Sequence, residues 1–91
     1  MAEIRIRHDH WQQMLDECRN RAPIEACGLV AGKDGESIQV FPAENALQSP
    51  VRYRLDPRQQ LQILLEIDAL NCDLLAIYHS HPLGPSVPSE T

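Results

Sequence analysis

Two histidines separated by one residue, His79 and His81, directly follow an apolar run at residues 74–78. Side chains alternate along an extended segment, so residues two apart project to the same side. Both imidazoles can then reach one zinc ion at about 2.0–2.1 Å. The spacing predicts a metal site, and an ordinary hydrogen-bonded histidine pair is the alternative. A second pair of this form, His8 and His10, lies at a predicted helix start, where we expect surface residues without a function.

Three further residues have types and positions that suit a catalytic site. Glu25 precedes an apolar segment, where a carboxylate must either face solvent or serve a partner. Ser89 lies in a loop that returns from the histidines, and Gly28 permits close backbone approach. Each also has a structural explanation: a solvated loop carboxylate, a turn residue and a small residue at a strand crossing.

The strands that position these residues follow from apolar alternation and turn signals. The predicted strands are 3–7, 26–32, 37–41, 53–55 and 73–78. The predicted turns and loops are 33–36, which contains an Asp-Gly turn signal, 42–50 and 82–91. The last strand is continuously apolar, which is typical of a strand buried on both faces.

The first predicted helix covers about residues 10–21. Asp9 is its predicted N-cap, with Gln12 as the capping-box partner, and Pro23 ends it.

The second predicted helix starts with Asp56 as N-cap and Pro57 at the first helical position, and it runs to about Leu70. Gln59 occupies the capping-box position. Apolar side chains form two stripes, so we expect this helix to pack on more than one side. The order of elements predicts an α/β fold with helices against a small mixed sheet.

Length and composition limit the class of protein. Ninety-one residues allow one small domain, residues 1–91. A net charge of −5 and scattered basic residues argue against nucleic-acid binding. No apolar run is long enough to span a membrane, and the N-terminus lacks the apolar core of a signal peptide. Three cysteines without a C-x-x-C pair predict no disulfide framework and a cytoplasmic protein.

Together these motifs resemble the JAMM, or MPN-plus, metallopeptidases. That family's signature is an early glutamate, then H-[ST]-H-P, seven residues and S-x-x-D; here Glu25, the segment 79–82 and Ser89 match it. The short prokaryotic branch also tends to carry residues that occur here in the same order: Asn45, Ser49-Pro50, Tyr53 and Asp56-Pro57. The resemblance covers essentially the whole chain.

The resemblance implies a function and a role for each residue. His79 and His81 would bind zinc together with an aspartate one position after Thr91, Glu25 would be the general base, and Ser89 would donate a hydrogen bond to the oxyanion. The implied substrates are amide or isopeptide bonds after the C-terminal glycines of ubiquitin-like proteins or β-grasp sulfur carriers. Because the signature continues past Thr91, we expect the domain to be incomplete at its C-terminus, and the 91-residue chain to hold zinc poorly.

The sequence leaves three alternatives to a peptidase. One is a non-catalytic MPN-type binding or scaffold module, although such modules lose the histidines and the glutamate. Another is a zinc deaminase, which has a similar cytidine-deaminase-like layout of sheet and helices but needs H-x-E and P-C-x-x-C, which do not occur here. The third is a structural fragment with exposed histidines. Cys27 is expected to be a small buried side chain beside Glu25 rather than a nucleophile or ligand.

Overall fold

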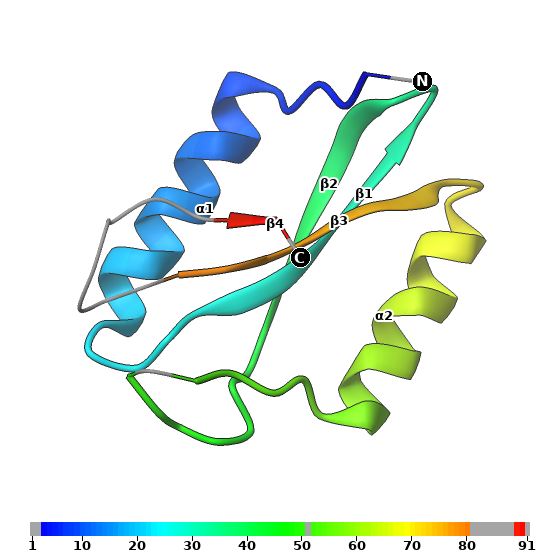
Figure 1. The fold of residues 1–91 in the computed structure, drawn as a ribbon. Coiled ribbons are helices and arrows are strands. Elements are labelled where there is room, and N and C mark those ends of the chain that lie inside the picture. Colours follow the sequence, from blue (N-terminus) through cyan, green and yellow to red (C-terminus); the bar gives the residue numbers. More distant parts are fainter. Residues whose placement is uncertain (1–2, 51, 81–88, 91) are drawn as a thin grey trace.

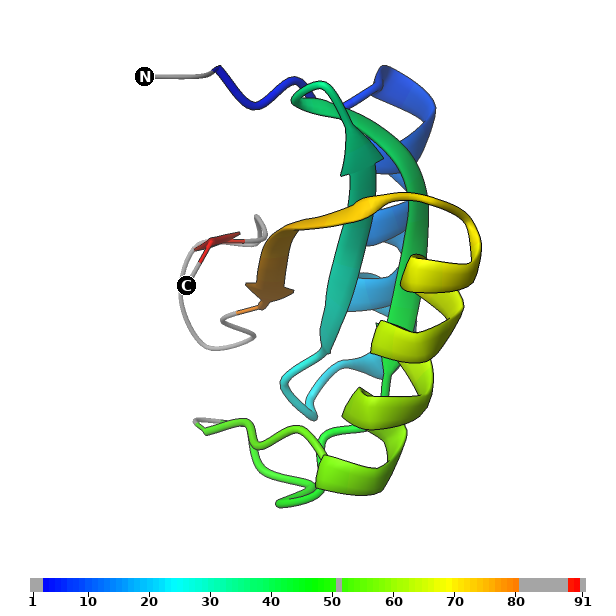
Figure 2. The same cartoon turned by 90° about the vertical axis from the view of Figure 1, so that its right-hand side faces the viewer.

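The computed structural model describes residues 3–50, 52–80 and 89–90. Its elements are α1 (His8–Arg21), β1 (Cys27–Lys33), β2 (Glu36–Ala43), α2 (Pro57–Ala69), β3 (Asp73–His79) and β4 (Ser89–Glu90). The strands form one sheet in the order β2-β1-β3-β4, with α1 on one face and α2 on the other (Figures 1 and 2). This arrangement confirms the predicted α/β fold class.

The strands named above pair antiparallel, and a parallel bridge joins Arg5 to Glu36. The mixed character of the described sheet therefore rests on that bridge. The predicted strand 3–7 is wrong, because Arg5 alone is bridged. Its N–H donates to Gly35 O at 2.7 Å and its carbonyl accepts from Ser37 N at 2.8 Å.

The predicted turn between β1 and β2 is confirmed. Asp34 and Gly35 both have positive φ, 52° and 80°, as a two-residue type I′ hairpin turn requires. The return strand β2 is longer than predicted and includes Pro42, which was assigned to a loop. Proline cannot donate to a strand ladder, and it is accommodated here because β2 is an edge strand of the described sheet.

The hydrophobic core forms on both sides of β1, the strand in which all residues but the last are buried. Side chains alternate along β1, so Leu29 packs with Ile63 and Ile67 of α2, whereas Val30 packs with Met14 of α1. Both helices therefore pack against one central strand. The segment just before β1, and the end of β3 that pairs with the first residues of β1, lie beside this core.

The strand β3 is less buried than its apolar sequence predicts. Leu74 at its start is 39% exposed, and Tyr78 near its end is buried. In the described part of the chain β4 pairs only with Tyr78 and His79, so the first half of β3 has a neighbour on one side only. The expected burial on both faces is wrong for the part described.

The helix α2 begins as predicted but packs differently. The Asp56 side chain accepts from Arg58 N at 3.1 Å, which confirms the N-cap, and Pro57 is the first helical residue. Gln59 does not act as a capping-box partner; its Oε1 accepts from Glu44 N at 2.9 Å. Only one side of the helix contacts the sheet, so a set of leucines is exposed: Leu61, Leu65 and Leu70. The expected packing on more than one side is wrong for the described residues.

The helix α1 begins two residues earlier than predicted. Arg7 is the N-cap residue and has no side-chain cap; instead its N–H donates to Ser37 Oγ of β2 at 2.9 Å. Asp9 therefore lies inside the first turn, where it pairs with Arg7, and Gln12 donates to Asp16. The predicted cap is thus replaced by a contact with β2. Local sequence rules cannot predict this contact, because the two residues are far apart in the chain.

Neither described helix has the length and apolar character needed to cross a bilayer.

Candidate active site

The first residues of β1 lie beside the last residues of β3. Cys27 pairs with His79, and Ser80 N donates to Ala26 O at 2.9 Å, so the contact continues past the end of β3. Ser80 Oγ also accepts from Ala26 N at 2.8 Å, and the Ser80 side chain is buried. These bonds fix the segment before β1 against the end of β3.

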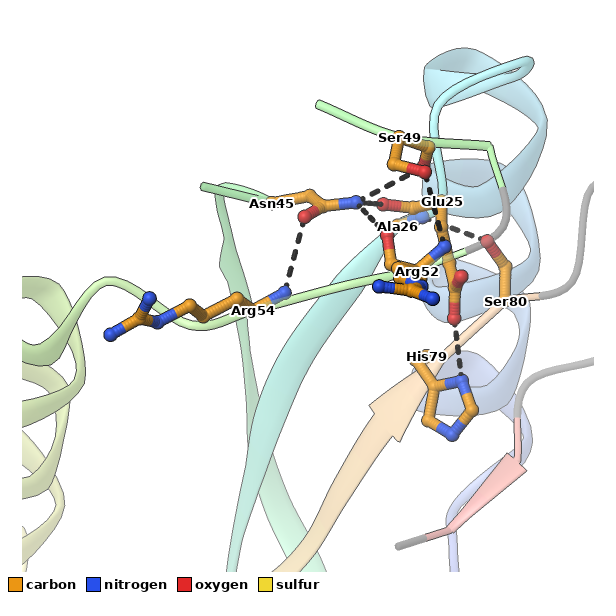
Figure 3. Close-up of polar contacts among 8 residues, drawn as sticks. All are labelled: Glu25, Ala26, Asn45, Ser49, Arg52, Arg54, His79 and Ser80. Carbon is orange, nitrogen blue, oxygen red and sulfur yellow. Dashed lines mark hydrogen bonds and ion pairs between the residues drawn. The ribbon is translucent and has the colours of Figure 1, made fainter. Parts of the chain in front are cut away.

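Glu25 and His79 meet at this junction (Figure 3). Glu25 Oε1 lies 2.7 Å from His79 Nδ1, and the side chains are 3% and 12% exposed. A buried carboxylate is stable only when it is paired and hydrogen-bonded. Glu25 is therefore not a solvated loop carboxylate, and its buried partner is the imidazole of His79.

The contact also bears on which nitrogen of His79 can bind a metal. A carboxylate at Nδ1 favours the tautomer with hydrogen on Nδ1 and a lone pair on Nε2. Zinc-binding histidines commonly donate their other ring N–H to a carboxylate in this way. The donor chemistry of the Glu25–His79 pair therefore fits a zinc site.

The aromatic ring of Tyr53 packs on His79. The two ring centroids are 4.5 Å apart and the planes are inclined by 17°, which is a stacked arrangement. Tyr53 was placed in a predicted strand, 53–55, but the structure has only a bridge between Leu55 and Asn45 there. The sequence contains no periodic signal for a stacking contact between residues so far apart in the chain.

Asn45 is a second residue whose contacts sequence reasoning missed. Its side chain is 1% exposed, and its Nδ2 donates to the carbonyls of Glu25, Ser49 and Arg52 at 3.1, 3.2 and 2.7 Å. Its Oδ1 accepts from two backbone N–H groups, those of Leu47 and Arg54. The resemblance to the short prokaryotic branch singled out Asn45 in a predicted loop, and it gave no indication of these contacts.

Of the other two predicted site residues, the structure describes the backbone of Ser89 and does not describe His81. The backbone of Ser89 pairs with that of His79, so the chain does return beside the histidine as expected, but residues 89 and 90 form strand β4 rather than part of the predicted loop. His81 lies outside the described residues. Among the side chains that are described, no group of three metal-binding types lies close enough together to hold an ion. The assigned roles of Glu25, His79, His81 and Ser89 therefore stay predictions.

Cys27 begins β1, two positions after Glu25. Its side chain is fully buried, and burial raises the pKa of its thiol to about 11. Near neutral pH the group stays protonated, whereas a nucleophilic cysteine reacts as a thiolate. The expectation of a small buried side chain is confirmed.

The other histidine pair lies at the start of α1. His8 is exposed, whereas His10 is half-buried and its Nδ1 lies 2.7 Å from Ser37 Oγ. The expectation that both are surface residues is therefore wrong for His10, which links α1 to β2.

The fold and this junction define an α/β domain with a glutamate–histidine pair where two neighbouring strands meet. A model of prokaryotic homologues of the JAB domain matches residues 7–91, and the chain belongs to this family. This confirms the resemblance to the short prokaryotic branch.

Several relatives are similar over most of this chain. A desampylase of Pyrococcus furiosus is 31% identical over 88% of the chain and 57% of its own length. A CysO-cysteine peptidase of Mycobacterium tuberculosis is 36% identical, over 94% and 60%. A probable TtuB-protein conjugate cleaving protease of Thermus thermophilus is 42% identical, over 84% and 54%. The chain thus spans less than two thirds of the length of each of these relatives.

The fold has a close counterpart among solved structures. The solution structure of a protein from Desulfitobacterium hafniense superposes with a TM-score of 0.81 at 33% identity. The match covers 98% of this chain and 62% of that protein.

Proposed function

We propose that this chain carries the active site of a zinc-dependent peptidase that hydrolyses the amide or isopeptide bond after the C-terminal Gly-Gly of a ubiquitin-like or sulfur-carrier β-grasp protein. The observation that carries the proposal is the buried contact of 2.7 Å between Glu25 Oε1 and His79 Nδ1. The relatives' names support the substrate class, because they refer to desampylation, CysO and TtuB conjugates.

His79 and His81 would hold the zinc ion, with the aspartate that the family signature places one position after Thr91 as a third ligand. When bound, zinc lowers the pKa of a coordinated water to about 7. The chain's own residues would position that zinc and move the protons.

Glu25 would act as the general base and then the general acid. Its carboxylate accepts a proton from the attacking water and later gives it to the leaving amine nitrogen. Burial at 3% exposure keeps bulk water from competing for this proton. The contact with His79 holds one carboxylate oxygen, Oε1, and so orients the other, Oε2, as the proton acceptor.

Ser89 would donate a hydrogen bond to the oxyanion that forms on the scissile carbonyl. The pairing of its backbone with His79 supports this role, because it brings the residue to the same end of β3 as Glu25.

We also propose a cytoplasmic location, which the three free cysteines Cys18, Cys27 and Cys72 support.

The proposal is tested with a full chain extended through the position that the signature assigns to aspartate, and a β-grasp carrier joined through its Gly-Gly end to a reporter. Cleavage at the glycine is expected, with loss of activity in a chelator and recovery on adding zinc. The matched control substrate has Ala-Ala in place of Gly-Gly. A protein that binds zinc and the carrier but cleaves neither substrate would instead be a binding module.

A further inference from the structure

Asn45 makes more contacts than the proposed reaction accounts for. Three backbone carbonyls accept from its Nδ2, and two backbone N–H groups donate to its Oδ1. The described residues of the segment that follows, 45–50 and 52–54, are thereby held around one buried amide. Both polar atoms of the Asn45 side chain are hydrogen-bonded, which offsets the cost of burying it, and the backbone groups that it binds point to a further role.

The same segment holds the backbone of Glu25 through both its N–H and its C=O group. Glu25 O accepts from Asn45 Nδ2 at 3.1 Å, and Glu25 N donates to Ser49 O at 2.8 Å (Figure 3). Glu25 precedes β1 and lies outside its ladder, so these bonds replace strand pairing as the restraint on its position.

The segment also carries Tyr53, whose ring is stacked on the face of His79. Glu25 contacts the edge of the same imidazole at Nδ1. One contact in the ring plane and one on the ring face together restrict rotation of His79 about its side-chain bonds. Both contacts come from residues that Asn45 positions, one directly and one through the loop.

We propose that Asn45 is a positioning residue for the active site: it holds Glu25 against the edge of His79 and Tyr53 against its face. The proposal rests on the proposed function for its effect on catalysis, whereas the effect on His79 itself is independent of any activity. Asparagine is required because one side chain must donate through Nδ2 and accept through Oδ1. Aspartate has the same shape but cannot donate, and its charge would face three carbonyl oxygens.

The test compares variants of the full chain: Asn45→Asp, Asn45→Ser, Tyr53→Ala and Tyr53→Phe. Gln59→Ala is the matched control, because it removes a loop hydrogen bond to Glu44 N nearby without touching Glu25, His79 or the Asn45 contacts. Two measurements are made on each folded variant. One is kcat and KM on the Gly-Gly fusion, and the other is the proton NMR shifts of the His79 imidazole in metal-free protein, assigned with His79→Gln.

Stacking under Tyr53 shifts the His79 ring protons upfield. We expect Tyr53→Ala to abolish this shift, Tyr53→Phe and Gln59→Ala to keep it, and both Asn45 variants to move the signals toward those of Tyr53→Ala. The Asn45 variants should also lower kcat by on the order of 10- to 100-fold, with a smaller change in KM, as expected from misplaced catalytic groups.

Unchanged His79 shifts and unchanged kcat in a folded Asn45 variant would overturn the proposal. If neither Asn45 variant folds, the Tyr53 pair decides, and identical His79 shifts in Tyr53→Ala and Tyr53→Phe overturn it. A wild-type protein that cleaves nothing, while the Asn45 variants still shift the His79 signals, would reject the proposed function and leave the positioning intact.

Discussion

The chain contains two pairs of histidines with the same spacing, and the two pairs lie on different kinds of secondary structure. His8 and His10 lie in the first turn of α1, whereas His79 ends β3 and His81 follows it two positions later. Residues two apart on a helix point about 200° apart, because each residue turns the helix by about 100°. On a strand they point to the same side. An H-x-H pair on an extended segment could therefore converge on one metal ion, whereas the pair in α1 cannot.

The surroundings of the two pairs differ as well. His10 contacts a serine hydroxyl and His8 faces solvent. His79 contacts a buried carboxylate at its edge and an aromatic ring on its face. The contrast teaches that backbone geometry and the partner of each imidazole, rather than the spacing of the two residues, decide whether a histidine pair could bind a metal.

The largest expected effect that tests this contrast is on zinc content. His79→Ala should reduce bound zinc in the full chain from one per molecule to close to none, because it removes one of three ligands. His8→Ala is the control and should retain one zinc. Elemental analysis of both proteins, purified in parallel without chelators, measures the difference. Equal zinc contents would show that the metal, if any, lies elsewhere.

A second prediction concerns the exclusion of water from Cys27, at the junction of β1 and β3. Cys27 pairs with His79, and burial raises its thiol pKa from 9.0 to about 11. Below pH 9 the thiol is protonated in both the folded and the unfolded chain. Between pH 9 and about pH 11 the unfolded thiol ionises first, so the free energy of unfolding falls, by about 2–3 kcal/mol from this group.

Urea unfolding at pH 8 and pH 11 checks this prediction, with Cys27→Ala as the matched variant. The stability advantage of the wild-type protein over Cys27→Ala should shrink by that amount between the two pH values. A constant difference would mean that water reaches the junction.

The smallest expected effect is at the helical pair. His10→Ala removes the contact with Ser37 Oγ and should lower the free energy of unfolding by about 1 kcal/mol. His8→Ala should change it by less than about 0.5 kcal/mol, because His8 is exposed. Chemical denaturation of the two variants measures this, and both should keep wild-type zinc content. A loss of zinc in His10→Ala would contradict the structural role given to it.

Local sequence signals predicted much of this fold. The Asp34-Gly35 turn, the Asp56 N-cap and the central strand β1 were confirmed, because each depends on neighbouring residues. The start of α1 was wrong because Ser37, thirty positions away, binds Arg7. The exposure of Leu61 was missed for a related reason: a sequence pattern says that a side chain is apolar and does not say what covers it.

The site was also predicted only in part. Glu25 and His79 were selected from residue type and spacing, and the structure brings them into contact. The stacking of Tyr53 and the bonds of Asn45 were not predicted, because both depend on tertiary contacts that the described residues 45–50 and 52–54 make with Glu25 and His79. Loop conformations of this kind are set by tertiary hydrogen bonds. Such bonds produce no periodic pattern of residues from which they could be predicted.

The most direct test of the central claim is a comparison of wild-type protein with Glu25→Gln, with zinc content and cleavage of the Gly-Gly fusion measured on the same samples. The substitution keeps the side chain's size and removes its ability to take a proton. We predict equal zinc contents and a fall in kcat of roughly 10²–10⁴-fold, the contribution typical of a general base. Cleavage by Glu25→Gln at the wild-type rate would contradict the assignment of Glu25, and with it the mechanism proposed for this site.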